Sequence, residues 1–110
     1  NPLTAIFRVR NGELLQPPHS IYLDALAREA WPVLHAEGLA MDEAAALARV
    51  REVAAATAQN RASMLQDVLA GRRTEIDAIT GALLAMARRQ GRAVPTHEAV
   101  YRLVKLLDAG

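Results

Sequence analysis

The sequence predicts an all-α domain of about six packed helices. Apolar residues recur along the chain at intervals of three and four, and no segment sustains the alternation of a strand. Hydrophobic residues make up 52% of the 110 residues but aromatic residues only 4%, so alanine carries much of the apolar content. Because alanine is the best helix former and a small side chain lets helices approach closely, we expect one domain of closely packed helices.

The first segment is expected to be short. Residues 2–9 have the pattern of the end of a longer helix. Asn11 followed by Gly12 predicts a turn, since asparagine tolerates left-handed conformations. Pro17 and Pro18 predict an extended break, because neither residue can donate a backbone hydrogen bond to a helix.

Two longer helices follow. Residues 19–37 predict a helix that ends at Gly38, and Pro32 inside it predicts a kink or a division into two pieces. Asp42 is the predicted N-cap of the next helix, which extends to Gln59. The residues predicted to face inward from it are Leu47, Val50 and Ala54.

A short helix is predicted over residues 62–70. Ser63, followed three residues later by Gln66, has the pattern of a helix cap, and Gly71 supplies the stop. The predicted buried residues of this helix are Met64, Leu65 and Val68.

The last two helices are predicted over residues 75–90 and from Thr96 onward. Thr74, followed by Asp77, has the pattern of a cap for the first, and Thr96 that of a cap for the second. The predicted buried residues are Ile76, Ile79, Leu83 and Met86 in the first, and Val100, Leu103, Val104 and Leu107 in the second.

The composition excludes several classes of function. A net charge of +1, with acids interspersed among the basic residues, does not favour nucleic acid. No apolar run is long enough to span a bilayer, so we expect a soluble protein. The chain has no cysteine and its three histidines share no metal-ligand spacing, so we expect a reducing compartment, the cytoplasm, and no metal.

Four separated motifs resemble one enzyme family. They are N-P-L-T-A from Asn1, N-G-E-L from Asn11, the stretch S-M-L-Q-D to T-E-I-D-A-I-T-G from Ser63, and the closing G-R-A-V-P-T with Tyr101, Leu103, Val104 and Lys105. In this order and spacing the chain resembles the C-terminal domain of ketopantoate reductases, the 2-dehydropantoate 2-reductase family. It departs from the family at Thr80, where asparagine is usual, and at Pro32.

The resemblance implies a fold, a reaction and a missing partner domain. The fold would be that of the C-terminal helical domain of the 6-phosphogluconate dehydrogenase-like superfamily. The reaction would be the NADPH-dependent reduction of ketopantoate, a small 2-keto acid, to pantoate in pantothenate biosynthesis. No G-x-G-x-x-G turn follows a strand, so residues 1–110 would be the substrate-binding domain alone. The fragment by itself would be inactive without its N-terminal nucleotide-binding domain.

The resemblance also implies roles for individual residues. Asn1, Asn11 and Ser63 fall on substrate-contacting positions, and Glu75 falls on a position associated with the nicotinamide cofactor. Amide and hydroxyl groups can bind a carboxylate without a cation. The family's general acid is a lysine upstream of Asn1, so no catalytic residue is expected in this chain.

Purely structural roles for these residues stay open. Ser63 could only cap a helix, Asn11 could only form a turn, and Glu75 could only interact with a helix dipole. The domain could accordingly be a helical association module that forms a homodimer and has no chemistry of its own. It could also belong to a related reductase that acts on another 2-keto acid.

Overall fold

The computed structural model describes residues 1–109, and Gly110, the last residue of the predicted domain, lies outside the described residues. These residues form six α-helices and two short helical segments of other types, without a strand. In chain order they are α1 (Pro2–Phe7), η1 (Asn11–Leu15), α2 (His19–Ala36), α3 (Glu43–Ala56), α4 (Ser63–Leu69), η2 (Asp77–Gly81), α5 (Ala82–Gln90) and α6 (Pro95–Ala109). The all-α prediction is confirmed.

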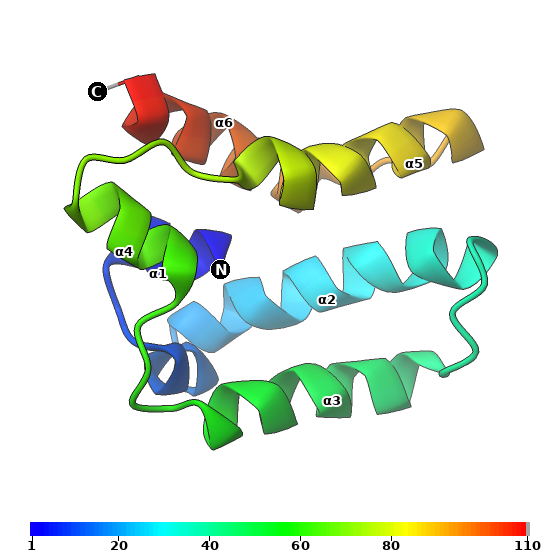
Figure 1. The fold of residues 1–110 in the computed structure, drawn as a ribbon. Coiled ribbons are helices and arrows are strands. Elements are labelled where there is room, and N and C mark those ends of the chain that lie inside the picture. The colour runs from blue at the N-terminus through cyan, green and yellow to red at the C-terminus, as the bar shows by residue number, and fades with distance from the viewer. Residues whose placement is uncertain (110) are drawn as a thin grey trace.

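The helix α2 is the centre of the arrangement (Figure 1). It contacts α3 on one side and α5 and α6 on the other, while α1 packs against α4 and α6 at one end. None of the helices in the described part combines the length and the hydropathy that crossing a bilayer requires.

Three clusters of buried side chains form the core. One joins α1, α4, η2 and α6, one joins α2 to α5 and the loop after it, and one joins α1, η1 and α6. Their buried members are Ala5, Met64, Ile76 and Val104; Val33, Leu83, Ala87 and Val94; and Leu3, Leu14 and Val100. The last helix therefore contributes to two of the three clusters.

Several element boundaries differ from the predicted ones. The first helix ends at Phe7 because Arg8 adopts a left-handed conformation with φ of 57°. Asn11 and Gly12 begin a 3₁₀ helix rather than a simple turn. Pro18 has helical rather than extended dihedral angles, and the peptide bond that precedes it is cis.

The helix α2 continues through Pro32 as one helix, so of the two predicted outcomes the division into two pieces does not occur, and the kink stays a prediction. The residue after the proline, Val33, is completely buried among residues of α5 and the loop that follows. This packing holds the helix together where one backbone hydrogen bond is missing.

One of the four predicted helix caps is confirmed. The Asp42 carboxylate accepts a hydrogen bond of 2.8 Å from the backbone N–H of Ala45, three residues ahead. This cap depends only on neighbouring residues, which is why the sequence pattern predicts it correctly.

The predicted cap of α6 by Thr96 is wrong, because Thr96 lies inside the helix and Glu29 of α2 supplies the acceptor. The Glu29 carboxylate accepts from the backbone N–H of Thr96 at 3.0 Å and from that of His97 at 3.2 Å. A carboxylate from another helix thus satisfies the first N–H groups of α6 and stands at the positive end of its dipole.

The buried stripe of the fifth helix also differs from the prediction. Residues Asp77–Gly81 form a π-helical turn, which holds more residues than an α-helical one. Within this turn Thr80 is buried and Ile79 is 42% exposed. Ile76 and Leu83 are buried as predicted, whereas Thr80 and Ala87 are buried in place of Ile79 and Met86, and Met86 is partly buried.

Three further residues predicted to be buried are at least one-third exposed: Val50, Leu103 and Leu107. Leu103 and Leu107 lie on α6 beside the buried Val100 and Val104. The helix buries a narrower stripe than the sequence pattern predicts, because the other helices cover only one side of it.

We expect Glu29→Ala to lower the free energy of unfolding by about 1–2 kcal/mol, because two N–H groups at the start of α6 lose their acceptor. Chemical denaturation followed by circular dichroism measures the change. Glu52→Ala is the matched control, since Glu52 lies on α3 in an exposed pair with Arg49, and its change should stay within about 0.5 kcal/mol. Equal losses in the two variants would contradict the role given to Glu29.

Candidate functional site

The 3₁₀ helix η1 is bound to the segment that follows α3. The backbone N–H of Asn11 donates to the carbonyl of Asn60 at 3.2 Å, and that of Gly12 donates to the carbonyl of Ala58 at 3.0 Å. The Asn11 side-chain amide donates to the Thr57 hydroxyl at 2.9 Å. Two hydrogen bonds therefore hold the backbone and the side chain of Asn11, and a third holds the residue after it.

The glycine beside Asn11 is required by this close approach. A Cβ at Gly12 would lie 2.7 Å from the Cβ of Ala58 and 3.0 Å from its Cα. Backbone atoms cannot yield as a long side chain can, so any larger residue would push η1 away. The sequence pattern predicts only a turn for this pair, whereas the structure shows that the glycine permits contact between two segments.

Asn1 and Asn11 line the same hollow. It has a volume of about 240 Å³ and lies between α1, η1, α2 and α3. Its lining residues are Asn1, Asn11, Leu14, Leu23, Val50, Val53, Ala54, Thr57 and Ala62. Val50, which was predicted to be in the core, is part of this wall, and this explains its exposure. The hollow thus combines an apolar wall with two amide side chains.

Ser63 does not cap α4. The N-cap is Ala62, which makes no side-chain cap bond, and Ser63 is the first residue of the helix and is exposed. The Gln66 side chain donates instead to the carbonyl of Arg61 at 2.8 Å. The predicted pairing of Ser63 with Gln66 is therefore wrong, and capping does not explain the serine. Its neighbour Ala62 lines the hollow, so Ser63 lies one residue from it.

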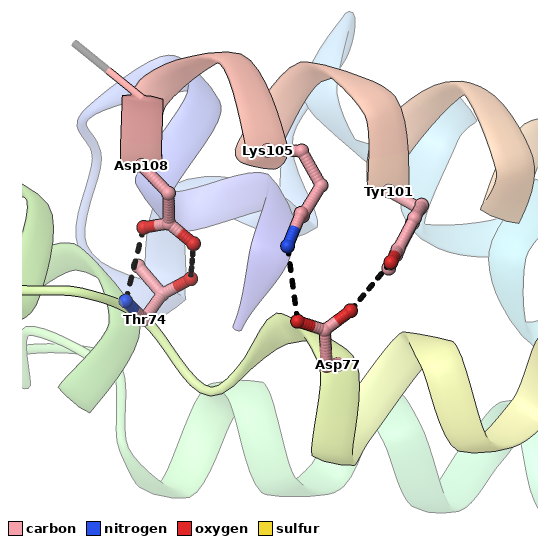
Figure 2. Close-up of polar contacts among 5 residues, drawn as sticks. All are labelled: Thr74, Asp77, Tyr101, Lys105 and Asp108. Atoms are coloured by element: carbon pink, nitrogen blue, oxygen red, sulfur yellow. Dashed lines mark hydrogen bonds and ion pairs between the residues drawn. The ribbon is translucent and has the colours of Figure 1, made fainter.

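Glu75 is exposed, and its two polar neighbours are bound by α6 (Figure 2). The Asp108 carboxylate accepts from the Thr74 backbone N–H at 2.9 Å and from the Thr74 hydroxyl at 2.7 Å. The predicted cap of the fifth helix by Thr74 with Asp77 is wrong, since both side chains turn toward α6.

The Asp77 carboxylate accepts from the Tyr101 hydroxyl and from the Lys105 ammonium group, the latter at 3.0 Å (Figure 2). The Tyr101 hydrogen bond and the nearby Lys105 hold the pKa of Asp77 below its ordinary value of 3.8. The same hydrogen bond to Asp77 raises the pKa of Tyr101 above 10.0. At neutral pH the aspartate is charged and the tyrosine is protonated, which is the combination that the hydrogen bond needs.

Of the residues predicted to form the site, the structure brings Asn1 and Asn11 into one hollow, whereas Ser63 directly follows the lining residue Ala62 but does not itself line the hollow. Glu75 lies on a separate segment after α4 and is not among the residues that line the hollow. The residues that hold this arrangement were not predicted, among them Thr57, Asp108 and Tyr101. No local pattern could have indicated them, because each acts on a residue at least 24 positions away.

Residues 1–108 match a family model described as the C-terminal domain of ketopantoate reductase PanE/ApbA. The chain belongs to this family. The resemblance seen in the four sequence motifs is therefore confirmed over nearly the whole chain.

Among its relatives is the 2-dehydropantoate 2-reductase of Yersinia pestis, 40% identical over 105 residues that make up 96% of this chain. The chain spans only 34% of the length of that protein. Among solved structures it is similar to the probable 2-dehydropantoate 2-reductase of Bacillus subtilis, with a TM-score of 0.91 and 42% identity over 97% of this chain and 36% of the other.

A second solved structure shares the fold but belongs to a different enzyme. It is D-mandelate dehydrogenase in a ternary structure with NADH and anilino(oxo)acetate, with a TM-score of 0.87 and 25% identity over 99% of this chain and 46% of the other. The helical domain therefore occurs in more than one kind of dehydrogenase.

We expect Gly12→Ala to lower the free energy of unfolding by about 1–3 kcal/mol, because the new methyl group would overlap Ala58. Gly81→Ala is the matched control. Its Cβ would meet Asp77 and Tyr101 at 3.7 Å, an ordinary contact, and alanine favours the helix by up to about 1 kcal/mol. Thermal unfolding of the two variants should thus give changes of opposite sign, and a stable Gly12→Ala protein would contradict the close approach.

Tyr101→Phe should raise the pKa of Asp77 toward 3.8, because the variant loses the hydroxyl that donates to the carboxylate. Titration of the aspartate carboxyl carbon by NMR measures it, with the exposed Tyr22→Phe as a control that should leave the pKa unchanged. Since the pKa is depressed in the folded state, the stabilisation is present above pH 3.8 and is lost as the pH falls through the lowered pKa. An unchanged Asp77 pKa in Tyr101→Phe would contradict the contact.

Proposed function

We propose that this chain is the substrate-binding domain of an NADPH-dependent 2-dehydropantoate 2-reductase, which reduces ketopantoate to pantoate. The observation that carries the proposal is the match to the family over residues 1–108, joined with the hollow that Asn1 and Asn11 line. An apolar wall with a few fixed polar groups is the usual form of a site for a small organic ligand.

The substrate carries a carboxylate, a keto group and a hydroxyl, all of which accept hydrogen bonds. The amides of Asn1 and Asn11 can donate to them from the hollow, and the exposed hydroxyl of Ser63, the residue after the lining residue Ala62, is a further donor. The Asn11 amide already donates one of its two hydrogens to Thr57, which leaves the other for the substrate in a fixed direction. Such preorganised donors bind an anion at little cost in reorganisation.

The proton and the hydride would both come from outside this chain. Lys105, its only lysine, is paired with Asp77 on α6 and is not part of the hollow, so we place the general acid upstream of Asn1. When bound, NADPH would supply the hydride to the keto carbon, and the upstream general acid would supply the proton to the carbonyl oxygen. The exposed Glu75 carboxylate suits the cofactor side, since it can accept hydrogen bonds from ribose hydroxyls.

The nucleotide-binding domain would be the N-terminal neighbour of this chain, and the cleft between the two domains would hold both reactants. Closure of such a cleft aligns the hydride donor with the keto carbon and excludes water. We therefore expect the chain alone to have no reductase activity.

Two other functions have specific support. The similarity to D-mandelate dehydrogenase favours a relative that reduces a different 2-keto acid. The exposed apolar side chains Ile21, Tyr22 and Leu106 favour self-association, because an interface between copies would remove apolar surface from water.

The decisive experiment follows NADPH oxidation at saturating cofactor by the protein that includes the upstream region, with ketopantoate and with benzoylformate. Ser63→Ala should raise the KM for ketopantoate by about tenfold or more, because a hydrogen bond to a charged group is lost. It should leave the melting temperature unchanged, since the hydroxyl caps no helix. Ser20→Ala, the matched control on α2, should change neither quantity.

A preference for benzoylformate would identify the other keto-acid reductase. Absence of turnover with both substrates, together with self-association in sedimentation experiments, would favour the association module.

A further inference from the structure

The segment that carries Glu75 has little regular structure of its own. It connects α4 to η2, and residues 72–75 belong to no helix. Glu75 itself is exposed, and its carbonyl accepts from the backbone N–H groups of Ala78 and Ile79 at the start of the next helix. A carboxylate on such a segment needs external support if it is to keep one position.

That support comes from α6 on both sides of Glu75 (Figure 2). Asp108 binds Thr74, the residue before it, through both the N–H and the hydroxyl. Tyr101 and Lys105 bind Asp77, two residues after it. Because 101, 105 and 108 are spaced by four and three, the three side chains lie on one face of α6 and form a clamp.

The core supplies a third point of attachment. Ile76, directly after Glu75, is completely buried in the cluster with Ala5, Met64 and Val104. Thr74 is also buried, at 8% exposure. Thr74 and Asp77 are thus held by α6, and Ile76 is held by the core. Among residues 74–77, Glu75 is the one whose side chain is exposed and makes neither kind of contact.

The position of Asp108 is unfavourable for its own helix. It stands in the last turn of α6, where the helix dipole is negative and an acidic side chain is destabilising. The hydrogen bonds to Thr74 offset this cost. We therefore attribute the aspartate at position 108 to its contact with Thr74 and not to the stability of α6. A substitution that improved the helix would release the segment.

We propose that Asp108 is a positioning residue for Glu75, and that the clamp formed by Asp108, Tyr101 and Lys105 fixes the Glu75 carboxylate for contact with the cofactor. The inference rests on the proposed function, because it gives Glu75 its role in the cleft. Fixing a group that contacts a reactant matters for rate and binding, since small displacements there reduce both strongly.

The test uses the protein with its upstream region and measures NADPH affinity by fluorescence, kcat/KM with ketopantoate, and the melting temperature. Asp108→Asn keeps the shape but removes the negative charge that strengthens both hydrogen bonds from Thr74, so we expect NADPH Kd to rise and kcat/KM to fall by about tenfold. Thr74→Val, which removes only the hydroxyl contact, should give a smaller change in the same direction and tests the contact independently if Asp108→Asn folds poorly. Asp24→Asn, in the ion pair with Arg51 between α2 and α3, is the matched control and should change neither quantity.

A double variant separates positioning from general stability. If Asp108 acts through Glu75, then adding Asp108→Asn to Glu75→Gln should produce no further loss in NADPH affinity or kcat/KM, because the group being positioned is already altered. Losses that multiply in the double variant, or single variants that stay within twofold of the unaltered protein, would overturn the clamp while leaving the reductase intact. An unaltered protein that neither binds NADPH nor reduces a 2-keto acid would overturn the proposed function, and the clamp's role with it.

Discussion

The structure depends on fixing α6 at both ends with carboxylates. Glu29 from α2 holds the first N–H groups of the helix, and Asp108 near its other end holds Thr74. Hydrogen bonds with a charged partner are about twice as strong as neutral ones. Such contacts near both ends of α6 therefore fix the position and the direction of the helix. Because α6 contributes to two of the three core clusters, its position determines how α1, α4 and η2 pack together.

The two parts of the candidate site are built in different ways. The hollow is bounded by α1, η1, α2 and α3, and hydrogen bonds from η1 to the segment after α3 hold Asn11 in its wall. Glu75 instead depends on α6, through contacts on either side of it. A change in the packing of α6 would therefore move Glu75 without moving the wall that contains Asn11.

Local patterns predicted what neighbouring residues determine. The helix content and the Asp42 cap follow from spacing and from a side chain three residues away, and both are confirmed. The roles of Glu29 and Asp108 could not be predicted, because their partners lie 67 and 34 residues away. Val50 shows a second limit, since an apolar residue at a helical interval can line a hollow as well as a core. The roles of Asn1, Asn11, Ser63 and Glu75 stay predictions.

The π-helical turn at Asp77–Gly81 makes the length of this stretch more important than its composition. Loss of a single residue there would produce an ordinary α-helix, but it would rotate the two flanking parts by about 100° relative to each other. Either Ile76 or Leu83 would then leave the interior, although both are now buried. Deletions and insertions should consequently be rare here in descendants of this sequence, while the exposed loop around Gly38 can vary in length.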